Sequence, residues 1–406
     1  MKNAEVIIIG GGVVGASVAY HLTERGCRDV LILEREDSLG RGSTGKATGG
    51  VRAQFETEIN IKLSLYSLDF FRDWEFDCEY EPRGYLFLAT DEKQFDFLKR
   101  TGNKQRSLGY EGVALVDTGT ILDIVPGLNC EDIVGGSFGP RDGFINPLAI
   151  LEGFMTEAVL RGARLKTEIN VRSIITKGGR AVGVETSEGV IESEKVVICT
   201  GAWTRKLAAT AGLDLPVEPL RRQIVWARSE NALPPDLPMV IDMSNGFHFR
   251  QVLDGDQSAS TPTIPAFGHP SSGRRGASGS DLMLAYPDAD EKPGFSTEFD
   301  DGFIDKVYEK VRHRAPFLAE TTVVREKCRA GLYENTPDHH AILGGCEVGG
   351  LYFANGFSGH GVMHSPATGR ALAEIILDGQ ASFLDVSSLI IERFAKGELL
   401  HETAFL

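Results

Sequence analysis

Short, fully apolar runs and longer amphipathic segments alternate at the start of the chain, as they do in α/β proteins. Val6–Ile9 is continuously apolar, which is expected of a strand buried on both faces of a parallel sheet. The next segment ends at Gly26, a residue type that commonly terminates helices, and Val30–Leu33 repeats the first apolar run. The apolar positions between them have the spacing of one helical face: Val14, Val18, Ala19 and Leu22. We therefore expect a strand, a helix and a second strand in this order.

Two later regions carry strand patterns of their own. Residues 162–195 alternate between apolar and polar positions and predict two or three strands around Gly178–Gly179. Residues 196–203 predict a buried strand that runs into Thr-Gly-Ala-Trp. Residues 350–379 predict a strand, a glycine-rich loop and an amphipathic helix that ends at Gly379. The apolar positions of that helix are Val362, Leu372, Ile375 and Ile376.

The region between these segments is rich in predicted strands. Residues 219–229 and 246–252 alternate as strands do. Val252–Asp281 is rich in Ser, Gly and Pro and has no periodicity, so we expect a mobile loop there. Such a loop is either a lid over a substrate or a tolerated surface insertion, because long loops cost little additional entropy.

Composition and charge narrow the class of protein. A chain of 406 residues with 42% hydrophobic and 24% charged residues is expected to form two globular domains, or one with a large insert. Its net charge of -15 argues against non-specific nucleic-acid binding. The six cysteines are scattered without metal-ligand spacing, which predicts no metal site and fits a reducing cytosol. We expect a cytoplasmic protein without a membrane span, because the chain has no signal peptide pattern and no apolar run of about 20 residues.

A glycine motif follows the first predicted strand. Gly10, Gly12 and Gly15 have GxGxxG spacing, and Glu34 stands at the end of the second strand. The first glycine permits a tight turn, the second permits close approach of a pyrophosphate, and the third permits helix–strand packing. The acidic residue is expected to hold a ribose hydroxyl pair and would repel a 2′-phosphate, which disfavours NADP. The alternative is a glycine-rich turn without a ligand.

The chain resembles the amine-oxidising FAD family that contains sarcosine oxidase, glycine oxidase and D-amino acid oxidase. Four motifs occur in the order of that family: Gly10/Gly12/Gly15/Glu34, Ser43-Thr44-Gly45, Thr200-Gly201-Ala202-Trp203 and Gly356 to Gly361. Residues 330–344 look most like the flavin subunits of sarcosine oxidase and dye-linked proline dehydrogenase. The motifs are specific for the family and not for one substrate.

The resemblance implies an α/β fold in which a Rossmann-like FAD-binding domain of the GR2 type adjoins a mostly antiparallel substrate domain. Residues 1–85, 146–216 and 327–406 would form the FAD-binding domain, and residues 86–145 and 217–326 the substrate domain. The residues that would bind FAD are Gly10, Gly12, Val13, Val14, Gly15, Glu34, Arg35, Ser43, Thr44, Lys46, Ala47, Thr48, Gly49, Gly50, Val171, Thr200, Gly201, Trp203, Gly331, Leu332, Gly356, Gly359, His360, Gly361, Val362 and Met363.

The resemblance also implies the reaction. An FAD enzyme of this family would oxidise the C–N bond of a small amino acid to an imine by hydride transfer to flavin N5. Sarcosine, proline or another secondary or N-methyl amino acid is the first expectation. A D-amino acid or glycine oxidase is an alternative, and an FAD-bearing assembly subunit with little turnover is another. The electron acceptor would be a quinone, a dye, a flavoprotein or O2, and additional subunits are possible. A second GxGxxG occurs at residues 40–45, but it does not directly follow an apolar strand run as the first one does, so no NAD(P)H domain is evident.

Three residues are candidates for the reaction site. Arg52 is suited to a substrate carboxylate, because its planar fork makes two charge-assisted hydrogen bonds. It could instead pair with an FAD phosphate or with Glu56, in which case Tyr333 or Arg250 is the next candidate. Tyr333 occupies the position of an arginine in glycine oxidases and either faces the ligand or packs. His360 precedes the last long helix, whose N-terminal amides rather than the imidazole are expected to stabilise negative charge on the flavin.

Two positions bear on how FAD is held and reoxidised. Relatives with a covalent flavin carry a cysteine at the position of Gly331, and Cys328 lies three residues away, so we expect non-covalent FAD. Monomeric sarcosine oxidases carry a lysine at the position of Met283, and a neutral thioether cannot stabilise superoxide as a cation can. We therefore expect a dehydrogenase rather than an oxidase.

Overall fold

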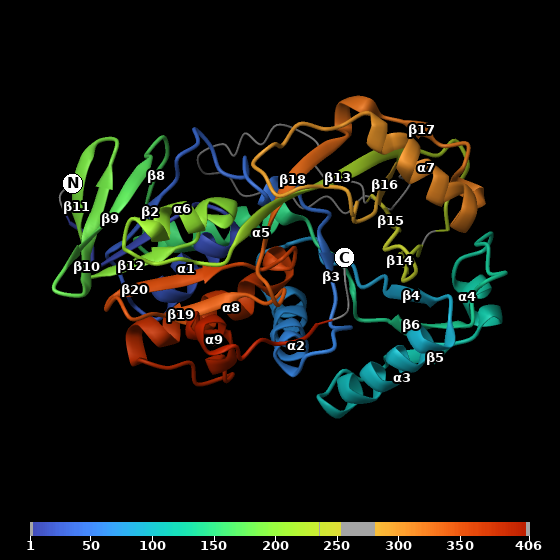
Figure 1. Cartoon of the computed structure of the whole chain (residues 1–406), viewed down its shortest axis with the longest axis horizontal. Helices are drawn as coiled ribbons and strands as arrows, with labels where there is room; N and C mark the ends of the chain where they lie inside the picture. Colours follow the sequence, from blue (N-terminus) through green and yellow to red (C-terminus); the bar gives the residue numbers. More distant parts are fainter. Residues whose placement is uncertain (1–2, 235, 253–280, 403–406) are drawn as a thin grey trace.

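The computed structural model describes residues 3–234, 236–252 and 281–402, and their strands form two large sheets side by side (Figure 1). The first sheet has six strands in the order β19-β20-β12-β1-β2-β8, and only β19 runs antiparallel to its neighbour. Its strands are β1 (Val6–Ile9), β2 (Val30–Leu33), β8 (Arg164–Lys166), β12 (Lys195–Ile198), β19 (Ile342–Gly345) and β20 (Leu351–Asn355). The two apolar runs predicted at the start of the chain are therefore central parallel strands.

Alternating residues of β1 belong to different hydrophobic cores. Val6 and Ile8 pack with the helices on one face of the sheet, whereas Ile7 and Ile9 pack on the other face. A strand buried on both faces has no position for a polar residue, which explains its continuous apolar sequence. The helices are α1 (Val13–Glu24), α2 (Glu58–Asp73), α5 (Pro147–Leu160), α6 (Thr204–Ala209), α8 (Gly361–Asp378) and α9 (Glu392–Lys396).

Helix α8 ends at the predicted residue, but its polar face is buried rather than exposed to solvent. It stops at Gly379, which has the left-handed conformation with φ 88° that glycine adopts readily. The sequence predicted an amphipathic helix with one apolar face. The helix instead packs against α1, α2 and the sheet, so polar residues such as His364 and Ser365 are also buried. The small residues of α1 and α8 permit this close packing, and Gly369 lies directly against Ser17.

A three-stranded antiparallel sheet covers one end of the first sheet. It consists of β9 (Val171–Lys177), β10 (Arg180–Thr186) and β11 (Gly189–Glu192). Gly178 and Gly179 both have positive φ and connect β9 to β10, as the sequence predicted. The preceding strand, β8, belongs to the six-stranded sheet instead.

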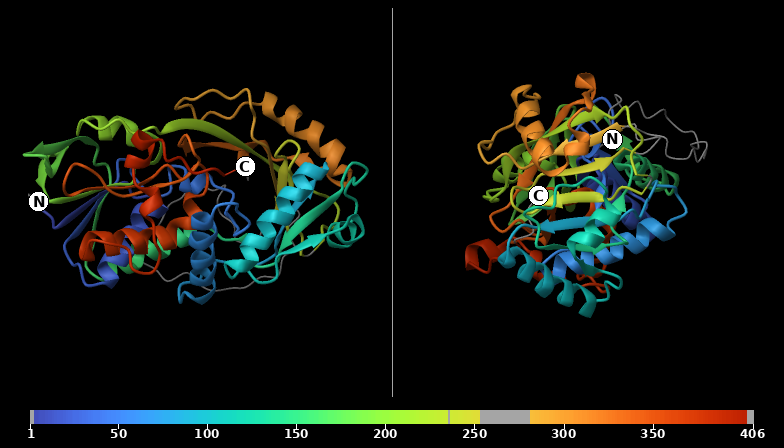
Figure 2. Two further views of the ribbon diagram at one scale, coloured as in Figure 1. Left: turned by 60° about the horizontal axis from the view of Figure 1, so that its bottom comes forward. Right: turned by 90° about the vertical axis from the view of Figure 1, so that its right-hand side faces the viewer.

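The second large sheet has nine strands in the described residues and is antiparallel except where β14 pairs with β4. Its path is β17-β13-β16-β15-β14-β4-β6-β5, and β18 pairs with β13. The left view of Figure 2 shows this half of the molecule at the opposite end from the N-terminus. Its strands are β4 (Tyr85–Ala89), β5 (Ala114–Val116), β6 (Gly135–Gly139), β13 (Glu218–Arg228), β14 (Met239–Asp242), β15 (His248–Gln251), β16 (Asp281–Ala285), β17 (Thr322–Val323) and β18 (Arg329–Asn335). The associated helices are α3 (Glu92–Ser107), α4 (Thr118–Ile124) and α7 (Gly302–Arg314).

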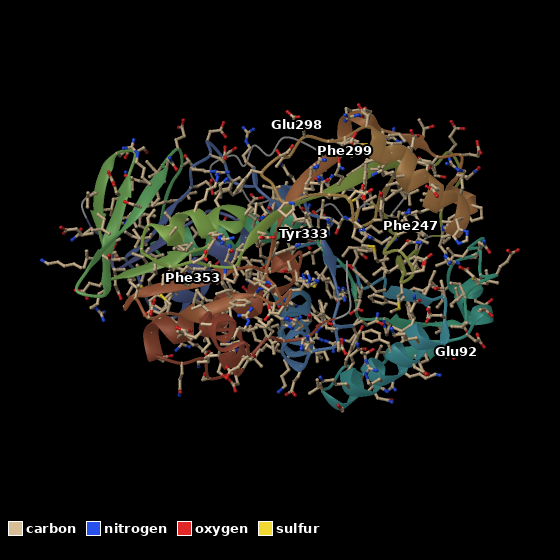
Figure 3. The ribbon with its side chains drawn as sticks, in the orientation of Figure 1. Glu92, Phe247, Glu298, Phe299, Tyr333 and Phe353 are labelled. Carbon is tan, nitrogen blue, oxygen red and sulfur yellow. The ribbon has the colours of Figure 1, made fainter. Side chains whose placement is uncertain are left out.

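The two halves meet at β18 and at a short ribbon formed by β3 (Gly50–Val51) and β7 (Gly143–Phe144). Strand β18 lies in segment 327–406, which was predicted to belong to the FAD-binding domain, yet it pairs with β13 of segment 217–326. Figure 3 places Tyr333 of this strand between Phe353 in the first half and Phe247 in the second. The predicted loop at Val252–Asp281 falls almost wholly outside the described residues, and the strands at its two ends pair with each other.

Candidate active site

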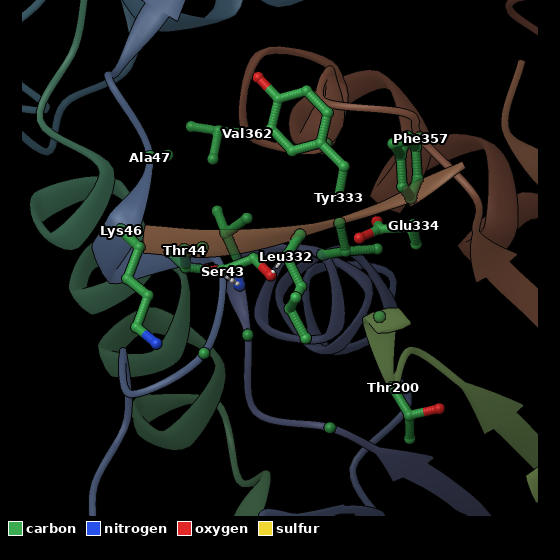
Figure 4. A pocket seen from close by; sticks show the side chains of 18 of the residues that line it. Ser43, Thr44, Lys46, Ala47, Thr200, Leu332, Tyr333, Glu334, Phe357 and Val362 are labelled. Carbon is green, nitrogen blue, oxygen red and sulfur yellow. Dashed lines mark hydrogen bonds between the residues drawn. The ribbon is translucent and has the colours of Figure 1, made fainter. Parts of the chain in front are cut away.

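A cavity of about 390 Å3 lies between the first sheet and the strands β13 and β18 (Figure 4). Tyr333 and every predicted cofactor residue except Gly15, Gly356 and His360 line it. Those that line it are Gly10, Gly12, Val13, Val14, Glu34, Arg35, Ser43, Thr44, Lys46, Ala47, Thr48, Gly49, Gly50, Val171, Thr200, Gly201, Trp203, Gly331, Leu332, Gly359, Gly361, Val362 and Met363. The fold thus brings four distant motifs to one cavity, and their contacts with a cofactor stay a prediction.

The N-terminus of α1 opens on one end of this cavity. Its first turn contains no acidic residue, and no side chain of its N-cap, Gly12, occupies the amides. A side chain at Gly10 would come within 2.3 Å of the Cys199 carbonyl oxygen, and one at Gly15 within 2.0 Å of the Gly10 oxygen. Gly15 therefore packs the helix on the strand, the role predicted for it, and does not need to line the cavity. The Val13 N–H donates to the Thr44 hydroxyl at 3.2 Å, and the other amides of this turn lie at the positive end of the helix, which fits a diphosphate.

Glu34 is oriented by backbone amides at the end of β2. One carboxylate oxygen accepts a hydrogen bond from the Gly11 N–H at 2.8 Å, and the other accepts one from the Glu36 N–H at 3.0 Å. The side chain still lines the cavity, so this carboxylate is placed to accept hydrogen bonds from ribose hydroxyls. Arg35 lies over the ring of Trp203 at 3.7 Å, and this pair forms part of the same end of the cavity.

The N-terminus of α8 opens on the other end. Gly361, Val362 and Met363 line the cavity, and the first turn of the helix has no acidic residue. The His360 ring points elsewhere, because it packs edge-on against Phe55 at 4.9 Å. Burial holds the pKa of His360 well below its usual value, so the imidazole is neutral. The amides and dipole of α8, rather than the imidazole, are the groups at this end that can stabilise negative charge, and this role stays a prediction.

Tyr333 is held tightly at the same end. The backbone of Gly359 leaves room for its ring, since a Cβ there would come within 2.3 Å of the ring. Gly359 has a φ of 97°, so a side chain would also strain the backbone. Burial raises the pKa of the Tyr333 hydroxyl, which therefore stays protonated at neutral pH. In Figure 4 the ring stands beside Val362 at the edge of the cavity.

Arg52 does not line the cavity. It is 1% exposed, donates a hydrogen bond to the Gln54 carbonyl at 2.7 Å and lies over the Phe55 ring at 4.0 Å. Arg250 is equally buried and donates to the Thr48 carbonyl. Both arginines thus hold the loop between Lys46 and Gln54 from outside the cavity. A role for Arg52 in substrate binding stays a prediction.

Sequence reasoning missed several residues of the second sheet that line this end. They are Arg222 on β13, His248 on β15, and Tyr286 and Pro287 after β16. No motif marks them, because strand alternation shows which residues share a face but not which face meets the cavity. Glu334 was missed as well. It lines the cavity beside Gly201, and burial raises its pKa to about 7.

The structure places the three residues that bear on how FAD is held and reoxidised: Gly331, Cys328 and Met283. Gly331 lines the cavity against Lys46, and a Cβ at Gly331 would come within 3.1 Å of the Lys46 Cβ. The Cys328 thiol is buried against the Trp226 backbone instead. Met283 is 2% exposed, and its sulfur lies 3.7 Å from Nη2 of Arg329. A cation therefore packs beside the thioether that replaces the lysine.

The described residues contain no group of three or more metal-ligating side chains. None of the helices they form is long and apolar enough to cross a membrane.

Comparison with known proteins identifies relatives along almost the whole chain. The FAD-dependent oxidoreductase domain-containing protein 1 of Xenopus laevis is 32% identical, and the match covers 99% of this chain and 84% of that protein. Mitochondrial dimethylglycine dehydrogenase of Rattus norvegicus is 29% identical over 97% of this chain, which spans 45% of that protein. The crystal structure of L-proline dehydrogenase from P. horikoshii has a TM-score of 0.86 and 27% identity, and covers 98% of this chain and 100% of that one.

These findings agree with the fold and the cavity. The structural likeness confirms the predicted α/β fold with an FAD-binding half and a mostly antiparallel second half. The family model described as FAD dependent oxidoreductase matches residues 5–375. FAD is accordingly the cofactor, and the enzyme acts on amino-acid-like substrates. The chain belongs to the FAD dependent oxidoreductase family, DAO.

Proposed function

We propose that the protein oxidises the C–N bond of a small secondary or N-methylated amino acid to an imine and passes the electrons to an acceptor other than NAD(P). One observation carries this proposal. The cavity has a diphosphate-binding helix end and Glu34 on one side, while its other end is closed by Arg222, His248 and Tyr333. A cation, a neutral imidazole and an aromatic ring suit a small molecule that carries both a carboxylate and an amine.

The residues at this end have distinct tasks. When bound, FAD accepts the two electrons that leave the substrate. The N-terminal amides of α8 stabilise negative charge, and the rings of Tyr333 and Tyr286 exclude water from the reacting carbon.

His248 is placed to interact with the amine. Its Nδ1 lies 2.9 Å from the Gly246 carbonyl oxygen, which makes Nδ1 the protonated nitrogen and leaves Nε2 as an acceptor. Burial, with the cations of Arg52 and Arg222, lowers the pKa of His248 to about 4. The imidazole is therefore neutral at physiological pH and can accept a hydrogen bond from the substrate nitrogen without repelling it.

The relatives support an amine donor with a carboxylate. Two of them are named for proline and dimethylglycine, which are both amino acids with an alkylated nitrogen. The Xenopus relative is named for its FAD-dependent oxidoreductase domain and for no substrate. An FAD-bearing assembly subunit with little turnover, expected from the sequence as an alternative, is the second candidate.

Anaerobic titration of the purified holoprotein tests the proposal. Sarcosine, L-proline and N,N-dimethylglycine are added in turn, together with glycine and D-alanine, and loss of the visible flavin absorbance is recorded. Bleaching by one of the first three supports the proposal. Faster bleaching by glycine or D-alanine identifies a primary amino acid oxidase instead. Propionate, which has no nitrogen, is the control, and no bleaching by any amine-containing acid favours the assembly subunit.

Location and partners complete the proposal. The cytoplasmic location expected from the sequence stays a prediction, and the rat relative is named as mitochondrial. The acceptor is proposed to be a quinone, a dye-like carrier or a flavoprotein, with further subunits possible.

A further inference from the structure

We propose that Arg222 binds the carboxylate of the substrate and thereby selects amino acids over simple amines. This inference rests on the proposed function and names the group that fixes one end of its substrate. It places the anion site on β13 of the second sheet, next to Tyr333, and assigns it to Arg222 rather than to Arg52.

The position of Arg222 gives its side chain room to enter the cavity. Arg222 lies directly opposite Gly331 in the antiparallel pair of β13 and β18, so no side chain stands opposite it on that face. The next residue of β18 on the same face is Tyr333, and the guanidinium carbon lies 5.7 Å from the centre of its ring. Arg222 and Tyr333 both line the cavity.

The guanidinium lacks an anionic partner among the described residues. Its Nε is buried without a hydrogen-bond partner, and Nη1 makes only a long contact of 3.4 Å with the Arg221 carbonyl. The two acids whose charge reaches it are both paired elsewhere: Glu291 with Arg221 at 2.9 Å, and Asp288 with Lys306 at 2.7 Å. Burial lowers the pKa of Arg222, as expected for a cation that is partly desolvated without a counterion. Such an arrangement is costly unless a ligand supplies the missing charge.

The other arginines near this end of the cavity are engaged. Three of them donate hydrogen bonds to carbonyls of the loop between Lys46 and Gln54. Arg52 donates to Gln54, Arg250 donates to Thr48, and Arg329 donates to Lys46 and Ala47. Arg35 and Arg41 line the opposite end, where they contact Trp203 and Asp37. Arg52, Arg250 and Arg329 do not line the cavity, whereas Arg222 lines it at the substrate end. A guanidinium can hold a carboxylate with two parallel hydrogen bonds, which also fixes the orientation of the ligand.

Two non-oxidisable ligands separate this role from catalysis. Pyrrole-2-carboxylate and its neutral carboxamide have the same shape, and binding of each to the holoprotein is followed by the change in the flavin spectrum. The wild type is expected to bind the carboxylate more tightly than the carboxamide. Arg222→Gln should weaken carboxylate binding by roughly 30- to 1000-fold, with little effect on the carboxamide, and Arg222→Lys should lose less.

Arg221→Gln is the matched control. Arg221 is the adjacent residue of β13, pairs with Glu291 and does not line the cavity, so both ligands should bind this variant as they bind the wild type. Arg52→Gln is compared in the same assay. Equal affinity of the wild type for the two ligands overturns the proposal, as does unchanged carboxylate binding by Arg222→Gln. A selective loss in Arg52→Gln alone, or a colourless Arg222→Gln protein, overturns it too.

The same variants separate this inference from the proposed function. If an amino acid bleaches the flavin but Arg222→Gln keeps the wild-type KM, only the inference fails. If no amino acid bleaches the flavin, the ligand-binding assay still decides whether Arg222 is an anion site.

Discussion

Replacement of Asp142 by asparagine should remove a pH-dependent part of the stability of this protein. Asp142 is fully buried at the turn between β6 and β7 and fixes the loop that leaves the cavity. Its carboxylate accepts hydrogen bonds from the Ala53 N–H at 2.8 Å, the Tyr110 hydroxyl at 2.8 Å and the Gln54 amide at 2.9 Å. Burial raises its pKa from 3.8 to about 6, although these donors and Arg52 oppose the shift.

The direction in which stability changes with pH follows from the difference in proton binding between the folded and unfolded states. Because the folded-state pKa is raised, the folded protein binds this proton more tightly than the unfolded chain does. The resulting stabilisation is fully present below pH 3.8 and is lost as the pH rises through about 6. At about pH 5 the proton-binding factor of Asp142, 1 + 10^(pKa − pH), is about 10 times larger for the folded state than for the unfolded state, which corresponds to about 1.4 kcal/mol of stabilisation. At about pH 7.5 the two factors are nearly equal, so this contribution to stability is close to zero.

Urea unfolding at these two pH values measures the effect. The stability of the wild type minus that of Asp142→Asn should be about 1.4 kcal/mol more favourable at about pH 5 than at about pH 7.5. Other titrating groups cancel in this difference, since both proteins contain them. Asp117→Asn is the control, because the Thr120 N–H lowers the pKa of Asp117, so that its difference should show no gain at acidic pH. A difference for Asp142→Asn that is equal at both pH values, or larger at the higher one, refutes the reasoning.

Three further predictions concern the flavin and the ring beside it. Acid precipitation should release all FAD to the supernatant, because Gly331 offers no thiol; flavin that stays in the pellet contradicts this. Reduced enzyme should be reoxidised slowly by air and quickly by an artificial dye, because Met283 is neutral, and rapid stoichiometric peroxide formation would show an oxidase. Gly359→Ala should displace the Tyr333 ring and lower kcat/KM by roughly tenfold or more, with FAD retained. The same change at Gly379, which also has positive φ but no neighbour within 4 Å, should leave kcat/KM unchanged, and equal losses in both variants would show a general effect of backbone strain.

The sequence predicted the first half of the fold well, because its signals are local. Four apolar residues between turns make a buried parallel strand at Val6–Ile9 and again at Val30–Leu33, and both strands are present. Helix α8 shows the limit of this reasoning. The sequence predicted that the helix ends at Gly379. It could not predict the burial of the helix, because this depends on contacts with α1 and α2, which are far away in sequence.

The second half could be predicted only as a collection of strands. Residues 219–229 and 246–252 alternate as strands do, and β13 and β15 are found there. Periodicity does not specify partners, and β13 pairs with β16, β17 and β18, all of them later in the chain. The face of β13 that meets the cavity is decided by these pairings. This is why neither Arg222 nor His248 could be recognised as a site residue.

The arginines illustrate why nearness to a motif is a weak guide to function. A glycine-rich loop around a cofactor turns its backbone through tight bends, and its carbonyls then need donors from outside the loop. An arginine has five N–H groups and satisfies several such carbonyls at once. Arg329 does so at Lys46 and Ala47, and Arg52 does so at Gln54. An arginine next to such a loop is thus expected to support the loop first, whereas an arginine that serves a ligand must keep its donors unused. A site arginine is therefore recognised because it lines the cavity and has no anionic partner in the described fold, as at Arg222, and both properties exist only once the chain has folded.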